Sequence, residues 1–137
     1  MTKMDMIWVA AAGLIHPSMT PATTVTRRQI EAKVKALFGA SITPVMVERH
    51  LVSSEDRLAD KADPRRGGSR NRYLFRTSDG VTPSRTGGFR LYKNADRGHD
   101  GLEKTGPTHP AREAVDAKYC DLIDWYEARY AGTSGDA

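Results

Sequence analysis

The chain has 137 residues, a length typical of one domain that leaves little room for a second core. A lone cysteine, Cys120, excludes an internal disulfide, and the longest uncharged run, residues 6–26, contains two prolines and several threonines, which excludes a membrane span there. The net charge is +4, but residues 65–93 hold eight basic side chains and one acid, Asp79.

This basic segment is almost entirely arginine, which favours a polyanionic partner. The guanidinium group is always charged and forks onto phosphate or base edges. A solvated surface on an ordinary basic protein is the alternative at this point. The first residues lack the basic start and clean apolar stretch of a secretory signal, and cysteine is scarce. We therefore expect a cytoplasmic protein without a cleaved leader.

The first 40 residues predict two helices joined by an extended piece. Asp5 is expected to cap a helix over residues 5–16, and residues 23–25 form an extended piece able to act as a minimal strand. Thr26 and Gln29 have the spacing of a capping box at the start of a second helix, which Gly39 ends. The inward positions of that helix are apolar: Ile30, Val34, Leu37 and Phe38.

Thr43 followed by Pro44 predicts the start of a third helix, which runs to about residue 53 with Val47 and Leu51 inward. Residues 54–71 have no sustained periodicity and predict a long loop. Alternating, aromatic-rich segments at 72–77 and 89–93 then predict a hairpin whose connection is Ser78–Gly87. Four apolar side chains of this hairpin are assigned to the core: Tyr73, Phe75, Phe89 and Leu91.

The C-terminal part is expected to be a linker loop over 94–110, a helix over 111–131 and a flexible tail over 132–137. The helix has an apolar side made of Val115, Tyr119, Leu122, Ile123, Tyr126 and Tyr130. Its aromatic residues, Trp125, Tyr126 and Tyr130 among them, favour a homodimer interface. Packing on the first helix within one chain is the alternative.

The order of these elements resembles that of the winged helix-turn-helix family. The last strand, Gly88-Phe89-Arg90-Leu91-Tyr92, is also similar to that of small bacterial winged-helix domains. The resemblance covers about residues 5–93 and predicts a winged helix-turn-helix domain over 1–93. It implies an α+β fold of three helices and a two- or three-stranded hairpin sheet, here with an extra C-terminal helix, and it makes Ser78–Gly87 the wing.

The resemblance implies a non-enzymatic protein that binds double-stranded DNA, either a small transcriptional regulator or an accessory factor. The third helix would enter the major groove with Arg49 and His50, although Glu48 on the same helix departs from a basic reading helix. Arg85 would lie at the wing tip. Arg65, Arg66 and Arg70 stand among glycines as in minor-groove arms. Three strand arginines serve either structure or phosphate contacts: Arg72, Arg76 and Arg90.

No catalytic, metal or cofactor signature is present in the sequence. No spacing puts two of the four histidines on one helical face, and Cys120 has no partner for a zinc site. His99, Asp100 and Glu103 suggest a small nuclease or toxin only as the weakest alternative. A protein–protein adaptor, using the hairpin and third helix on an acidic partner, is the stronger alternative to DNA binding.

Overall fold

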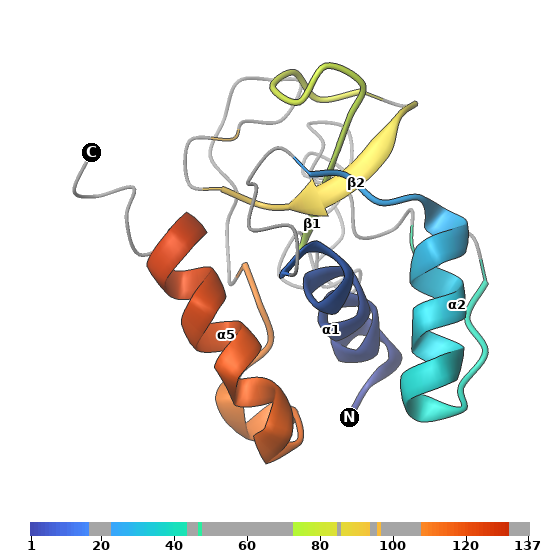
Figure 1. Cartoon of the computed structure of the whole chain (residues 1–137), viewed down its shortest axis with the longest axis vertical. Coiled ribbons are helices and arrows are strands. Elements are labelled where there is room, and N and C mark those ends of the chain that lie inside the picture. The colour runs from blue at the N-terminus through green and yellow to red at the C-terminus, as the bar shows by residue number, and fades with distance from the viewer. Residues whose placement is uncertain are drawn as a thin grey trace, which may run out of the picture.

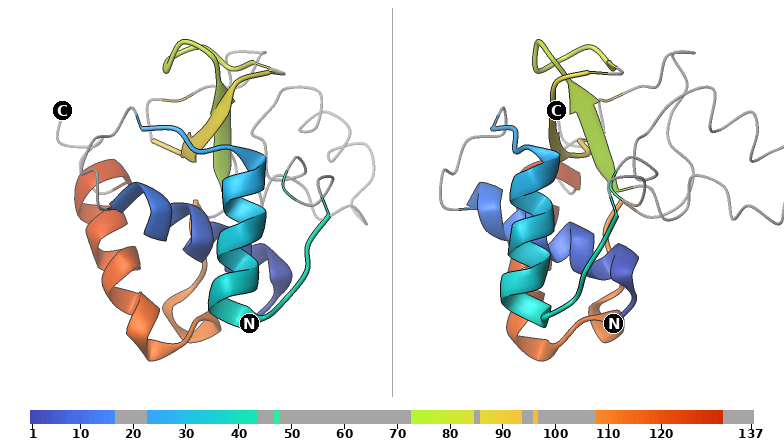
Figure 2. Two further views of the ribbon diagram at one scale, coloured as in Figure 1. Left: turned by 45° about the vertical axis from the view of Figure 1, so that its right-hand side comes forward. Right: turned by 90° about the vertical axis from the view of Figure 1, so that its right-hand side faces the viewer.

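The computed structural model describes residues 1–16, 23–43, 47, 73–84, 86–93, 96 and 108–131, with the backbone alone at 130 and 131. Within these ranges lie the helices α1 (Lys3–Ile15), α2 (Arg27–Phe38) and α5 (Cys120–Tyr126), and the strands β1 (Leu74–Thr77) and β2 (Gly88–Leu91), which pair antiparallel. Helix α1 lies between α2 and α5, beneath the hairpin (Figure 1). In the left view of Figure 2, α1 again runs between α5 and α2. The expected α+β class is thus confirmed.

Helix α1 is the centre of the fold because nearly every residue along it is apolar. A helix that is hydrophobic all round must be covered on all sides. Solvent does not reach seven of its side chains: Ile7, Trp8, Val9, Ala10, Ala11, Ala12 and Ile15. The predicted cap at Asp5 is wrong. Thr2 is the N-cap, because its hydroxyl accepts from the Asp5 amide at 3.2 Å and donates to the Asp5 carboxylate at 2.8 Å.

Helix α2 begins and ends as its sequence predicts. The Gln29 amide donates to the Thr26 hydroxyl at 3.1 Å, and the Thr26 amide donates to the Gln29 side chain at 2.8 Å, which closes the capping box. Gly39 adopts the left-handed conformation, φ +64°, that stops the helix. Ile30 and Val34 are fully buried against α1, so the amphipathic pattern is confirmed.

The hairpin strands are shorter than predicted. The minimal strand expected near residue 25 pairs with one of them, β2. Val25 and Phe89 exchange both backbone hydrogen bonds at 2.8 Å. The register pairs Phe75 with Arg90 and Arg76 with Phe89, so Phe75 and Phe89 lie on opposite faces of the hairpin. Phe75 is fully buried, as predicted, but it packs with Tyr92 in a cluster separate from the main one.

The predicted helix over 111–131 is interrupted. Two short 3₁₀ turns, Arg112–Ala114 and Ala117–Tyr119, precede α5, and a π turn, Glu127–Ala131, follows it. Val115 separates the 3₁₀ turns in an extended conformation, φ −120° and ψ 159°, and its side chain is buried in the core. The extended backbone at this buried, β-branched residue thus interrupts the continuous helix that the periodicity of apolar residues predicted.

Helix α5 packs on α1 within the chain. Tyr126 is fully buried and its ring meets the Trp8 ring edge-on, with centroids 5.6 Å apart. The Tyr126 hydroxyl donates to the Tyr92 carbonyl at 2.6 Å, which also ties α5 to the chain after β2. The intramolecular alternative is confirmed for Tyr126, Ile123 and Tyr119. Association of two copies stays a prediction.

Candidate nucleic-acid interface

The hairpin loop, residues 78–87, is organised by its one acid. Asp79 Oδ1 accepts from the amides of Val81 at 2.8 Å and Thr82 at 2.7 Å, and from the Thr77 hydroxyl at 3.0 Å. The Thr82 amide, followed by that of Val81, holds the pKa of Asp79 well below its ordinary value of 3.8. This carboxylate therefore remains charged while it gathers the amides of the loop around it.

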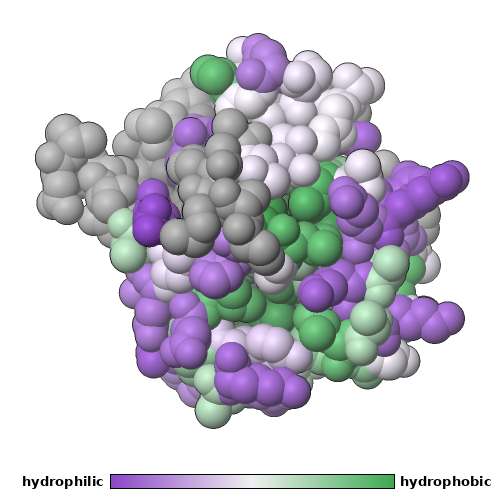
Figure 3. Space-filling model, viewed as in Figure 1, coloured by the Kyte–Doolittle hydropathy of each residue, from purple (hydrophilic) through white to green (hydrophobic). Residues whose placement is uncertain are grey.

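The chain returns from the hairpin loop to β2 through small residues and residues with hydroxyl groups. The Ser84 and Thr86 hydroxyls lie 3.2 Å apart, and the Thr86 amide donates to the Ser84 hydroxyl at 3.1 Å. Gly87 has φ +96°, and a Cβ there would lie 2.4 Å from the Thr77 carbonyl oxygen. Over the hairpin, the surface is pale in hydropathy, as these residue types dictate, whereas hydrophilic side chains crowd the helices (Figure 3). The loop thus presents hydroxyl groups at the surface, while the amides of Val81, Thr82 and Thr86 are bonded within it.

Arg76 supplies positive charge at the base of the hairpin loop. Its Nε donates to the Gly87 carbonyl at 3.2 Å, and its guanidinium lies 4.9 Å from the centroid of the Phe89 ring. The side chain is half-buried. The position of Arg76 fits both expected roles, structural support and phosphate contact. Its charge reaches the surface, while its aliphatic stem supports the hairpin.

Arg90 is removed from the candidate interface. Its side chain is 1% exposed, and its two terminal nitrogens donate to the two carboxylate oxygens of Asp96 at 2.7 Å each. A phosphate cannot reach this guanidinium, and Asp96 already neutralises it. The structural alternative therefore holds for Arg90, and the basic segment presents one positive charge fewer than its sequence indicates.

The extended piece before α2 lies beside the start of β2, a neighbour that the sequence analysis missed. Val25 pairs with Phe89, and Thr24 lies close to Gly88, where a Cβ would lie 2.6 Å from the Thr24 Cβ. Arg28 is exposed in the helical turn that follows. The sequence signal for this arrangement is the extended piece at 23–25, because its pairing with β2 fixes the position at which α2 begins.

The remaining predicted site residues lie outside the described part of the chain. They are Arg49, His50, Arg65, Arg66, Arg70, Arg72 and Arg85. The predicted third helix is described at Val47 alone, which is helical and fully buried, as the inward position requires. The alternative site at His99, Asp100 and Glu103 also lies outside the described residues.

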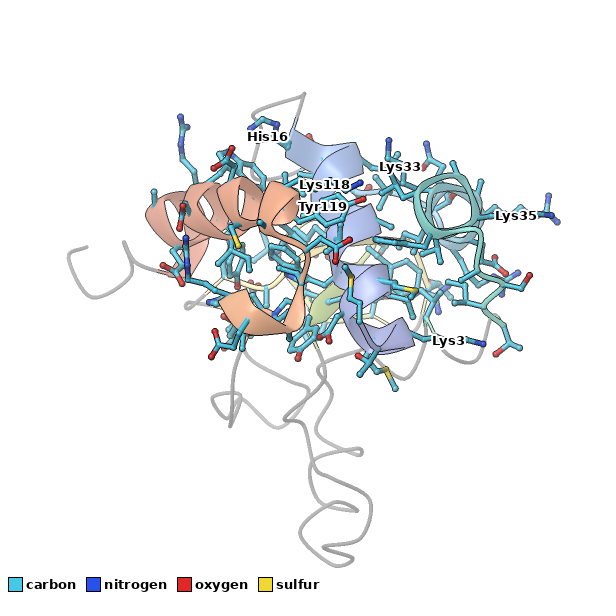
Figure 4. All side chains as sticks on the ribbon, turned by 90° about the horizontal axis from the view of Figure 1, so that it is seen from below. Lys3, His16, Lys33, Lys35, Lys118 and Tyr119 are labelled. Atoms are coloured by element: carbon cyan, nitrogen blue, oxygen red, sulfur yellow. The ribbon has the colours of Figure 1, made fainter. Side chains whose placement is uncertain are left out.

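Positive side chains also stand on the side of the molecule away from the hairpin. Figure 4, seen from that side, labels Lys3 at the start of α1, Lys33 and Lys35 on α2, and Lys118 in the 3₁₀ turn before α5. The Lys118 ammonium lies 5.2 Å from the centroid of the Tyr119 ring. Exposed acids accompany Lys118 on the same segment: Glu113, Asp116 and Asp121. Charge of both signs is mixed there, unlike in the 65–93 segment.

Comparison of the chain with protein-family models, curated proteins and solved structures finds no match. Within the described ranges, no three His, Cys, Asp or Glu side chains gather closely enough to hold a metal ion. Among the helices of the described residues, none has the length and apolarity needed to cross a membrane. The geometry and the charge of the hairpin side are therefore the observations that bear on function.

Proposed function

We propose that this chain is a winged helix-turn-helix protein that binds double-stranded DNA without catalysing a reaction, with the hairpin loop as its wing. The observation that carries the proposal is the pairing of Val25 with Phe89. This pair adds a minimal strand to the hairpin at the residue before the capping box of α2. It brings the start of α2 close to the start of β2, where the hairpin loop ends.

Each part of the hairpin side has a distinct task in the proposed complex. The hydroxyls of Ser84 and Thr86, with the charge of Arg76, contact phosphates and set the orientation of the protein on the duplex. Arg28, in the first turn of α2, supplies a further phosphate contact. Base edges are read by Arg49 and His50 on the third helix.

The arginines that flank the hairpin extend the contact along the backbone. Arg85 lies between two hydroxyl residues of the hairpin loop, and Arg65, Arg66 and Arg70 stand among glycines and serine in the preceding segment. Glycine allows the backbone to approach the duplex, and arginine favours a narrow minor groove. The proposal gives these residues sequence-independent contacts, together with Arg72.

The test is a fluorescence-anisotropy titration of the protein with a random-sequence duplex at several salt concentrations. Four neutralised phosphates would release enough counterions to lower the affinity roughly a hundredfold between about 50 and about 200 mM salt. Arg76→Gln should weaken binding to every sequence and reduce the salt slope by about one. Lys118→Gln, on the mixed-charge side, is the matched control and should leave both quantities unchanged.

A flat salt response, or no binding at micromolar protein, contradicts the proposal and favours the adaptor hypothesis. Arg49→Ala and Arg85→Ala then separate the two kinds of contact in a protein that does bind. Arg49→Ala should alter sequence preference, because a guanidinium fork on guanine is worth about 1–3 kcal/mol of discrimination. Arg85→Ala should weaken all sequences alike, so equal losses for both variants would reject the third helix as the reader.

A further inference from the structure

Arg90 and Asp96 form a buried group that is bonded to the hairpin loop. Besides its two bonds to Asp96, the guanidinium donates from Nη2 to the Gly80 carbonyl at 3.1 Å and from Nε to the same oxygen at 3.3 Å. Nη1 also donates to the Leu91 carbonyl at 3.1 Å. Arginine has five N–H groups, and the bonds to Asp96, Gly80 and Leu91 use all of them.

Further contacts hold the side chains of Arg90 and Asp96 in place. The guanidinium lies 4.5 Å from the centroid of the buried Phe75 ring, and Asp96 is 6% exposed. Asp96 Oδ2 also accepts from the Lys93 amide at 2.7 Å, and the Asp96 carbonyl accepts from the Tyr92 hydroxyl at 3.0 Å. Asp96 is thereby held by the chain after β2, and Tyr92 is held in turn by Tyr126 of α5.

We infer that Arg90 is a positioning residue, which clamps the turn of the hairpin loop at Gly80 to Asp96 and so fixes the angle at which the loop meets a duplex. The inference rests on the proposed function. The bonds that Asp79 makes organise the loop internally, from Thr77 to Thr82. Arg90 adds the connection of Gly80 to the second cluster and, through Tyr92, to α5.

The chemistry of the pair favours positioning over stability. A buried ion pair contributes little net stability, because the desolvation of two charges offsets their attraction, although removing one partner is costly. Its use here is geometric: the planar fork holds Asp96 on one edge and Gly80 on the other. Lysine has no second edge, so Arg90→Lys retains the charge and loses the clamp.

The test compares amide hydrogen exchange and duplex affinity in Arg90→Lys and in the wild type. The amides of Val81, Thr82 and Ser84 should exchange about tenfold faster in the variant, relative to any change at Ile30 and Val34 of α2. Affinity for a random duplex should fall about five- to tenfold, because a mobile loop must be ordered on binding. Asp96→Asn, which keeps the shape of the carboxylate, is the second variant and should act in the same direction.

Asp124→Asn is the matched control, since it removes an exposed ion pair with Arg112 and should change neither quantity. Equal acceleration of exchange in the loop and in α2 would overturn the clamp, because it would show a loss of global stability alone. Selective acceleration with unchanged affinity would overturn the positioning role. Failure of the wild type to bind any duplex would instead contradict the proposed function, and the exchange data would still decide whether the clamp exists.

Discussion

The two faces of the hairpin are held by different physical means. On one face Leu74, Phe89 and Leu91 pack against the central helix, where burial of apolar area is the main stabilising effect. On the other face Phe75 and Tyr92 surround a buried ion pair whose hydrogen bonds extend to the hairpin loop. Apolar packing tolerates small shifts, whereas bonds from a planar fork have fixed directions. The first face therefore sets whether the chain folds, and the second sets where the loop points.

Phe89→Ala should produce the largest loss of stability. The Phe89 ring is buried in the main core and lies beside the Arg76 guanidinium, so truncation leaves a cavity between hairpin and helix. We expect the free energy of unfolding to fall by about 3–5 kcal/mol, measured by urea denaturation. A loss below about 1 kcal/mol would show that the inner face does not anchor the hairpin.

Asp96→Asn should cost somewhat less, about 3 kcal/mol, because it leaves the buried guanidinium without its counter-charge. Replacing both partners with apolar residues, as in Arg90→Met with Asp96→Leu, should recover most of that loss while the loop stays unclamped. Denaturation of the single and double variants measures the coupling. An undiminished loss in the double variant would contradict the view that this pair serves geometry more than stability.

Gly87→Ala should cost about 1–3 kcal/mol, since alanine strains the positive φ and its Cβ would meet the Thr77 carbonyl. Thermal denaturation gives the global effect, and amide shifts locate it. Gly80→Ala is the matched comparison, because Gly80 also has a positive φ, +87°, but nothing lies within 4 Å of its Cβ position. A larger cost at Gly80 than at Gly87 would contradict the close contact described here.

Asp79 gives the smallest effect, visible only in acid. Its pKa is lowered in the folded chain, so its contribution to stability is complete above its ordinary pKa of 3.8 and is lost as the pH falls from there toward the depressed folded value. The amide resonances of Val81 and Thr82 should move in that acid range, while those of α2 move less. Asp79→Asn should abolish this step, and an identical acid response in the variant would contradict the assignment.

The sequence predicted elements whose signals are local. Thr26, Gln29 and Gly39 lie within a few residues of the backbone groups they satisfy, so the bounds of α2 were predictable. Asp96 lies beyond the end of β2. The sequence therefore could not show whether Arg90 binds this carboxylate or a phosphate. The helix is likewise interrupted at Val115, whose side chain is buried in the core. The periodicity of apolar residues does not reveal such a tertiary contact.

The most direct test of the central claim is a nuclear magnetic resonance titration of the isotope-labelled protein with a short random-sequence duplex. We predict that amide resonances shift most over residues 76–88, at Thr24 and at the start of α2. Resonances around Lys118 and α5, away from the hairpin, should shift little. Shifts concentrated on α5 or on the mixed-charge side, or no shifts at saturating duplex, would contradict a duplex-binding surface built on the hairpin.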